Sequence, residues 1–246
     1  MNDVVKLIQN HRSIRSFQNK EVSEEIIDEI LKSSQSMPNS INGQQTSVIV
    51  IRNKERKSQI AHLAGDQKWI EDAPVFLVFV MDFYKTHKAG EKTGNPQVIH
   101  ESIEGTLAGS FDGGIAMGGA IIAAESLGLG IVPIGGVRKN PAEIIELLEL
   151  PKYTYPLAGL AIGYPDKNSK KKPRMPFNTF KHNEKYHPEV LDEAIDVYDK
   201  EMEVYLKEIG REIEVNWSTA TSNVYKFVYY PNVYPTIKEQ GFKNDK

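Results

Sequence analysis

Cysteine is absent from all 246 residues of the sequence. Its absence excludes disulfide bonds, thiolate nucleophiles, iron–sulfur clusters and zinc sites built from cysteine. It also fits a reducing compartment, and we expect a cytoplasmic protein. Long apolar runs are lacking as well: residues 73–81 are too few to cross a bilayer as a helix, and the first residues carry no export signal. We therefore expect no membrane partner.

A strong charge of either sign is also lacking, because the formal net charge is only −3. Nothing draws the whole protein toward nucleic acid or an acidic membrane surface, so any anion site must be local. The histidines show no metal-binding spacing, and neither H-E-x-x-H nor G-x-S-x-G occurs. We expect no metal and no acyl transfer. The phosphate-binding P-loop and the G-x-G-x-x-G fingerprint are missing too, which disfavours a Rossmann dinucleotide site.

What the chain does contain is an alternation of helical and strand patterns. The run at 75–81 is almost continuously apolar, which is typical of a strand covered on both faces. Residues 111–127 are rich in glycine and alanine, which predicts a buried helix that its neighbours approach closely. These patterns predict a sheet under helices in a core domain at 1–166. The expected strands are 47–51, 75–81, 131–136 and 157–164.

Beyond the last expected strand, the composition changes. A polar, basic stretch at 167–172 leads to a helix that opens at Pro188 and is stopped by Gly210, with apolar residues on one stripe. That stripe needs a partner. We interpret residues 167–246 as a C-terminal extension that packs on the core or on a second subunit.

Two basic clusters are candidate anion sites. Arg12 and Arg15 lie three residues apart, so both side chains can reach one anion at a helix end. Lys172 and Arg174 flank a proline, which fixes the local backbone. Taken alone, each cluster is better explained as a solvated basic turn or loop. The first cluster adds donors at His11 and Ser13.

Two turns are candidate sites for a polar ring or chain. Asn39, Ser40 and Asn42 offer donors and acceptors on a loop that enters a strand, although these residues are also ordinary turn formers. Gly135 and Gly136 follow a strand, and their backbone N–H groups suit a developing negative charge. A plain turn is the alternative for this pair.

In this order, the clusters resemble the nitroreductase family of FMN-dependent oxidoreductases. The resemblance is greatest to the flavin reductases and oxygen-insensitive nitroreductases that take electrons from NAD(P)H. It covers most of the chain. The landmarks are HRSIRSF at 11–17, PNSINGQ at 38–44, AGDQ at 64–67, ESLGLG at 125–130, PIGGVR at 133–138 and KPRMP at 172–176.

The resemblance assigns roles by position. It implies that the FMN phosphate and ribityl chain are held by His11, Arg12, Ser13, Lys172 and Arg174. It places Arg15 and Gln67 at the pyrimidine side of the flavin, and Asn39, Ser40 and Asn42 in the same pocket. The backbone of Ile134, Gly135 and Gly136 would approach flavin O4 and N5. The flavin carries the chemistry, so no catalytic side chain is implied.

The resemblance also implies a fold and a reaction. The fold is α+β, with a central, mainly antiparallel sheet flanked by helices, and a homodimer whose C-terminal arms embrace the partner and whose FMN sites can draw on both chains. The reaction is ping-pong hydride transfer from NADH or NADPH through flavin N5 to nitroaromatics, quinones or free flavin. The alternatives are a specialised reductase of the same fold, such as a reductive dehalogenase-like enzyme, and a flavin-storage or flavin-sensing protein without turnover.

The sequence departs from the family pattern at two places. Asn39 stands where serine is common, and it keeps a hydrogen-bonding group. NADPH-preferring relatives carry an arginine cluster before the tail's tryptophan, whereas here a single arginine, Arg211, is followed by Glu212 and Glu214 before Trp217. Arg211 is therefore the one candidate for the nucleotide phosphate. Because two carboxylates oppose a phosphate, a strong NADPH preference is not expected.

Overall fold

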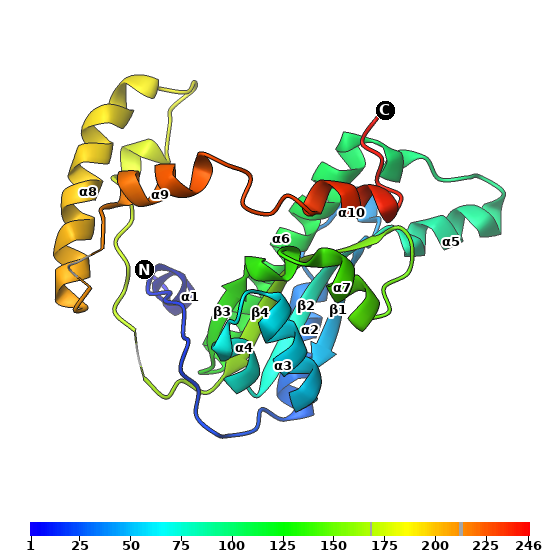
Figure 1. Ribbon diagram of the computed structural model, residues 1–246, viewed down its shortest axis with the longest axis horizontal. Helices are drawn as coiled ribbons and strands as arrows, with labels where there is room; N and C mark the ends of the chain where they lie inside the picture. The colour runs from blue at the N-terminus through cyan, green and yellow to red at the C-terminus, as the bar shows by residue number, and fades with distance from the viewer. Residues whose placement is uncertain (168, 212–213) are drawn as a thin grey trace. The chain divides into compact units, whose positions relative to one another are not determined.

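The computed structural model describes residues 1–167, 169–211 and 214–246 (Figure 1). The chain forms two compact units. The first comprises Met1–Ser169 and Tyr230–Lys246, and the second comprises Lys170–Tyr229. Each is described by itself below.

The first unit is built on a four-stranded sheet. Its strands are β1 (Thr46–Ile51), β2 (Val75–Asp82), β3 (Gly130–Ile134) and β4 (Thr154–Gly163), in the order β1-β2-β4-β3. All three pairings are antiparallel, which confirms the predicted α+β class with an antiparallel sheet. Every residue of β2 is buried, as its continuous apolar run predicted. The order leaves β1 and β3 at opposite edges of the sheet.

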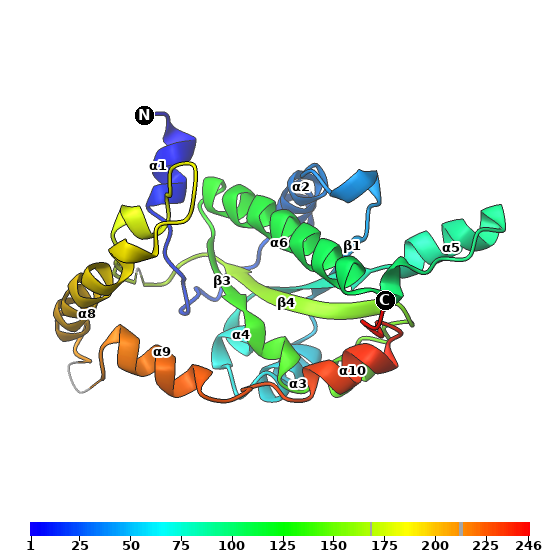
Figure 2. The same cartoon turned by 90° about the horizontal axis from the view of Figure 1, so that it is seen from above.

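Helices cover both faces of the sheet (Figure 2). On one face, α2 (Glu24–Gln35) and α6 (Ile103–Ser126) form a core with Leu77 and Leu160 of the central strands. On the other face, α3 (Lys54–Leu63), α4 (Lys68–Asp72) and α7 (Pro141–Leu147) pack around Val78. The three layers account for the burial of the central strands on both sides.

Side-chain caps fix where several helices begin. Ser23 Oγ accepts from the Ile26 N–H at 3.4 Å and fixes the start of α2. Pro141 occupies the first turn of α7, where its missing N–H is no loss. Asn140 occupies the N-cap position of α7, but its side chain makes no capping hydrogen bond. Its amide nitrogen instead donates to the Leu63 carbonyl at 2.7 Å and ties α7 to the end of α3.

Helix α6 is the longest element of the first unit and begins eight residues earlier than its glycine-rich pattern predicted. A Cβ on Gly109 would lie 2.7 Å from Met81 Cγ, and one on Gly113 would lie 2.3 Å from Leu157 Cδ1. The glycines therefore let the helix lie directly on the sheet. By length and composition α6 resembles a membrane-spanning helix, but its buried face belongs to the core.

The other elements of the first unit are short. They are α1 (Asp3–Gln9), η1 (Ser40–Asn42), α5 (Tyr84–Thr93), η2 (Ile99–Glu101), η3 (Gly135–Arg138) and α10 (Val233–Glu239). The segment that contains α10 is anchored to the sheet end, because Tyr153 N–H donates to the Gln240 carbonyl at 2.8 Å. Phe242 is fully buried, and its ring packs edge-on against Phe83 with centroids 5.8 Å apart.

The second unit is helical. It contains η4 (Phe177–Thr179), η5 (Pro188–Val190), α8 (Leu191–Glu208) and α9 (Trp217–Tyr225). The predicted apolar stripe of α8 buries Tyr198, Met202 and Leu206, and Trp217 packs edge-on against Tyr198 at 5.7 Å. The left-handed Gly210 (φ +71°) follows the end of α8, as predicted.

Candidate functional site

The segment that carries His11 to Arg15 runs beside the start of β3. Ile14 N–H donates to the Ile131 carbonyl at 2.8 Å, and the Ile14 side chain is buried against Gly130, where a Cβ would clash at 2.7 Å. Ser169 Oγ donates to the Ser13 carbonyl at 2.7 Å. The backbone of the first basic cluster is therefore fixed on both sides.

His11 is held by a carboxylate that the sequence analysis assigned no role. Its Nδ1 lies 2.6 Å from Oε1 of Glu125, near the end of α6. The Glu125 side chain is only 12% exposed. A carboxylate in the last turn of a helix, where the helix dipole disfavours negative charge, was the signal in the sequence for this partner.

Arg15 lies over an aromatic ring. Its guanidinium carbon is 5.5 Å from the centroid of Trp69 in α4, within the range of a cation–π contact. The buried Lys57 secures that helix, because its ammonium donates to the carbonyls of Glu71 (3.0 Å) and Ala73. Burial lowers the pKa of Lys57. The Arg15 side chain is thus oriented by Trp69 of α4, and Lys57 caps the end of that helix.

Gln67 and the glycine turn are in direct contact. Gln67 immediately precedes α4, and its Nε2 donates to the Ala64 carbonyl at 2.8 Å. A Cβ on Gly136 would lie 2.3 Å from that Nε2 and 2.4 Å from the Ala64 oxygen, so only glycine fits. Gly135 is exposed, whereas Ile134 is buried and offers only its backbone. The two predicted elements of the flavin's redox end therefore meet.

The loop that carries Asn39, Ser40 and Asn42 is organised by Asp112 of α6. Ser40 N–H donates to both Asp112 carboxylate oxygens at 3.1 and 3.0 Å, and Gln45 Nε2 donates to Oδ2 at 2.6 Å. Asn42 adopts a left-handed backbone with φ +57°. Asp112 was not predicted, although a carboxylate within an apolar, glycine-rich helix indicated a specific partner.

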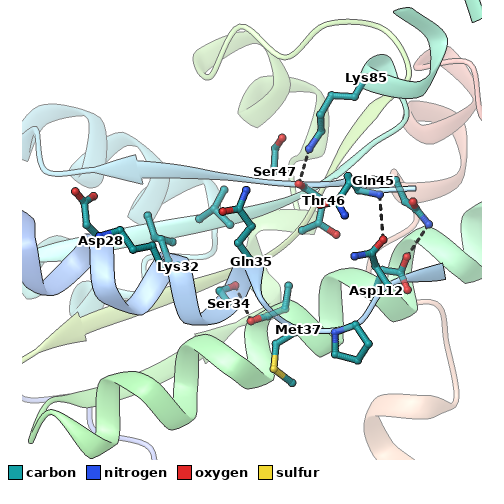
Figure 3. A pocket seen from close by; sticks show the side chains of 16 residues that line it. Asp28, Lys32, Ser34, Gln35, Met37, Gln45, Thr46, Ser47, Lys85 and Asp112 are labelled. Carbon is teal, nitrogen blue, oxygen red and sulfur yellow. Dashed lines mark hydrogen bonds between the residues drawn. The ribbon is translucent and has the colours of Figure 1, made fainter. Parts of the chain in front are cut away.

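A cavity of about 470 Å³ opens beside this loop, between α2 and β1 (Figure 3). Asn39 and Asp112 line it, and Lys85 reaches across to donate to the Thr46 carbonyl at 2.7 Å. The residues that line it include Asn39 but neither the His11 to Arg15 cluster nor the glycine turn. This cavity alone is therefore not the predicted cofactor site.

One copy of the chain holds the predicted residues of the first unit in two places. Ser40 is tied to Asp112 and His11 is tied to Glu125, and these anchors are separated by thirteen residues of α6, or about 20 Å along its axis. The loop also precedes β1, whereas the glycine turn follows β3 at the other edge of the sheet. His11 to Arg15, Gln67 and the glycine turn lie on the β3 side. Asn39, Ser40 and Asn42 lie elsewhere.

The second unit holds the remaining predicted cations. Arg174 Nη1 donates to the Lys172 carbonyl at 3.1 Å, and Tyr198 OH donates to the Pro173 carbonyl at 3.1 Å. Arg211 donates to the Glu214 carboxylate. Glu212, the other carboxylate predicted to oppose a phosphate there, lies outside the described residues.

The cations predicted to bind FMN differ from Arg211 in having no carboxylate partner in the described part of the chain. Within residues 1–167, 169–211 and 214–246, none of Arg12, Arg15, Lys172 and Arg174 has a carboxylate within 4.0 Å. Unpaired guanidinium and ammonium groups are the donors that a phosphate dianion requires. Four of the five predicted cations are therefore available to an anion, and Arg211 is engaged.

The chain matches known proteins over its whole length. The pattern of the nitroreductase family matches residues 8–164, and that of the nitroreductase family C-terminal domain matches residues 172–245. An FMN reductase (NAD(P)H) of Bacillus subtilis is 47% identical over 250 residues, which cover 100% of both chains. The solved structure of B. megaterium NfrA2 has a TM-score of 0.97 at 44% identity and covers 100% of both chains.

A third relative is solved with a nucleotide. The NADPH:FMN oxidoreductase from Vibrio harveyi complexed with NAD+ has a TM-score of 0.88 at 32% identity, covering 98% of this chain and 99% of that one. The family patterns, the full-length relatives and the antiparallel three-layer core agree, and the chain therefore belongs to the nitroreductase family.

Proposed function

We propose that this protein is an FMN-dependent NAD(P)H oxidoreductase that reduces small two-electron acceptors such as nitroaromatics, quinones or free flavin. The observations that carry the proposal are the cations at the family's landmark positions, which have no carboxylate partner in the described part of the chain, and a glycine turn in which Gly136 tolerates no side chain. Relatives that cover the whole chain are named FMN reductase and NADPH-flavin oxidoreductase, which supports the same activity.

The residues present fit FMN at both of its ends. For the phosphate, Arg12, Lys172 and Arg174 supply charge-assisted donors, with His11 and Ser13 beside the first of them. For the ring, Gly136 sits in a cradle formed by Gln67 and Ala64 that a Cβ would fill, and the exposed Gly135 leaves a backbone amide open. The site therefore offers positive charge at one end and fixed neutral donors at the other.

The chain's work in the reaction is binding and orientation. When bound, FMN would supply the two-electron chemistry, accepting a hydride from NAD(P)H and passing it to the acceptor in ping-pong order. Arg15, held over Trp69, and the amides of Gly135 and Gly136 stabilise negative charge that develops at the ring. Gln67 fixes the ring's orientation through its carboxamide. No side-chain nucleophile or metal ion takes part.

We also propose that the working form is a homodimer with shared sites, in which the loop of Asn39, Ser40 and Asn42 comes from the partner. The separation of about 20 Å along α6 supports this, because one chain does not gather the whole set. A second support is the outer face of α6, where Leu107 and Phe111 are exposed. Open space surrounds Gly114 and Gly118 on the same stripe, which lets a second helix approach closely.

The second unit is proposed to contribute Lys172 and Arg174 to the phosphate end and to act as the arm of the 167–246 extension. We also propose a cytoplasmic enzyme, which the absence of cysteine supports. For the electron donor, the Arg211–Glu214 ion pair supports use of NADH as well as NADPH, because the one candidate cation is partly neutralised.

The test of the proposed function is spectroscopic. Purified protein is expected to be yellow, and its visible flavin band should bleach under anaerobic conditions when NADH or NADPH is added. A colourless protein that takes up no added FMN would contradict the cofactor assignment. A yellow protein that neither nucleotide bleaches would favour flavin storage or sensing. Comparing the bleaching rates with the two nucleotides tests the donor assignment.

A further inference from the structure

We propose that Glu125 is a positioning residue for the flavin phosphate, acting through the imidazole of His11. This inference rests on the proposed function, since it assumes that His11 contacts that phosphate. Glu125 itself does not touch the cofactor in this scheme. It sets which nitrogen of His11 carries a proton and which way the ring faces.

The geometry determines the state of the ring. An ionised carboxylate only accepts hydrogen bonds, so the 2.6 Å contact requires that Nδ1 of His11 carry a hydrogen toward Glu125. Nε2 is then the one ring nitrogen left for an anion. Phosphate oxygens also accept, so contact with a phosphate requires a hydrogen on Nε2 as well. A ring with both hydrogens bonds Glu125 and the phosphate at once, and the carboxylate balances the charge of that ring.

The place of Glu125 in α6 supports a role beyond helix stability. It precedes Ser126, the last residue of the helix, where the exposed carbonyls disfavour a carboxylate. No basic residue occupies that last turn. The residue is nevertheless largely buried, and within the described residues its carboxylate pairs with His11. Burial of a charge at an unfavourable helix end indicates that the pairing with His11 is what keeps it there.

Glu125 also offsets the positive charge of the segment from His11 to Arg15. His11 is adjacent to Arg12, and Arg15 follows three residues later, so a charged imidazole adds a third cation to a short segment. A carboxylate at 2.6 Å relieves that repulsion without occupying either arginine. Arg12 thus remains free for the phosphate and Arg15 for the flavin ring, while His11 is held in a single orientation.

The experiment compares two ligands that differ only in the phosphate. Binding of FMN and of riboflavin to the flavin-free protein is measured by quenching of flavin fluorescence, for the wild type, Glu125→Gln and Glu125→Ala. We expect Glu125→Ala to weaken FMN binding about tenfold or more, since a charge-assisted contact is lost. Riboflavin binding should change less than about twofold, because riboflavin makes no phosphate contact. Glu125→Gln keeps an acceptor for Nδ1 without the charge and should fall between.

Two controls make the result specific. Glu29→Ala removes an exposed carboxylate that pairs with Lys32 on α2, and it should leave both affinities unchanged. In a His11→Phe background, Glu125→Ala should cause no further loss of FMN affinity, because Glu125 acts through His11. Thermal unfolding of each variant verifies that it is folded.

Several results would overturn the inference. Equal weakening of FMN and riboflavin would mean that Glu125 merely maintains the local fold, and an unchanged FMN affinity in Glu125→Ala would mean that it has no role. If Glu125→Ala weakens FMN binding by the same factor in the His11→Phe background as in the wild type, Glu125 does not act through His11. This comparison uses FMN alone, so it decides the question even if riboflavin binds too weakly to measure. If the wild type itself binds no FMN, the proposed function fails first, and this inference with it.

Discussion

At the scale of single residues, the partner of each cation separates the candidate ligands better than its position in the sequence does. Arg12 and Arg174 have no carboxylate within ion-pair distance in the described part of the chain, whereas Arg211 is bonded to Glu214. The sequence indicated the carboxylates beside Arg211, but it could not show that Arg12 and Arg174 are unpaired, because each of these two lies in a short cluster that is also typical of a basic turn. The side-chain environment decides which cations are available.

Replacing either free arginine should release the cofactor. Arg12→Ala and Arg174→Ala each remove a charge-assisted bond to phosphate, which contributes about 1.5–3 kcal/mol, or roughly a ten- to hundredfold loss of FMN affinity. The measurement is the flavin retained after dialysis and the dissociation constant on adding FMN back. Lys6→Ala, which removes a cation paired with Asp3, is the matched control. Full retention of flavin by both arginine variants would place the phosphate elsewhere.

The two adjacent glycines of the turn should respond differently to alanine. A Cβ at Gly136 would overlap Gln67 and the Ala64 carbonyl, at 2.3 and 2.4 Å, so the turn must move at a cost of about 1–3 kcal/mol. At Gly135 the nearest atom is the end of the Arg138 side chain at 3.4 Å, an ordinary contact. We expect Gly136→Ala to lose FMN and to unfold at a lower temperature, and Gly135→Ala to keep both properties. Similar behaviour of the two variants would contradict the cradle.

At the scale of elements, apolar periodicity predicted what the core requires and little else. The strand over 75–81 and the start of α2 were predictable, because burial on both faces and a serine cap leave clear patterns. Helix α5 was not predicted. It buries none of its residues, so its sequence has no apolar stripe to read. The early start of α6 was missed because its first turns are held by the Ser102 cap and by Gly105 and Gly109, which pack on Ile99 and Met81.

The short helix η2 ends at Glu101, whose carboxylate holds the C-terminal residues. Glu101 bonds the ammonium groups of Lys243, at 2.7 Å, and Lys246, and these bonds lower the pKa of Glu101 to about 2. A lowered carboxyl pKa stabilises the fold at a pH above the unfolded value of 4.5. The stabilisation is lost as the pH falls from about 4.5 toward 2. The bonds therefore anchor the C-terminal residues at neutral pH and release them in acid.

Glu101→Gln tests this anchor. We expect a lower unfolding temperature than the wild type at pH 7. The difference should shrink as the pH falls from 4.5 toward 2, because the carboxylate is protonated in the unfolded chain first and in the folded protein only near pH 2. The measurement is thermal unfolding across this pH range by circular dichroism. Glu91→Gln is a control, because its partners His87 and Lys88 lie within the same exposed helix. A difference that stays constant with pH would contradict the role of the charge.

At the scale of the whole molecule, the sequence predicted the members of the site but not their distribution. The landmarks predicted which residues hold the cofactor, which stays a prediction, and the antiparallel core was confirmed. That Ser40 and His11 are anchored to distant points of α6 follows from Asp112 and Glu125, two carboxylates whose partners lie 72 and 114 residues away in the chain. Such long-range pairs leave no local pattern. The resemblance implies sites that draw on both chains, and the fold adds which predicted residues one copy keeps apart.

The division of the site predicts complementation between two defective chains. Arg12→Ala damages the phosphate end, and a second variant with Ser40→Pro and Asn42→Ala damages the loop held by Asp112. If the loop comes from the partner, a heterodimer of the two variants contains one intact site and one doubly damaged site. Co-expression with random pairing should then restore about a quarter of the flavin sites, although neither variant alone retains FMN.

Two tags allow the heterodimer to be purified and its flavin content measured by absorbance. If every site were built within one chain, each site of the heterodimer would carry one of the two defects, and no flavin would return.

Phe111→Glu in both chains tests the same proposal by disrupting the contact between the two copies. This exposed residue of α6 would then carry charge into the proposed contact, and the protein should become monomeric and lose FMN while its own core, which Phe111 does not enter, stays folded. A folded monomer that retains FMN would show that one chain suffices.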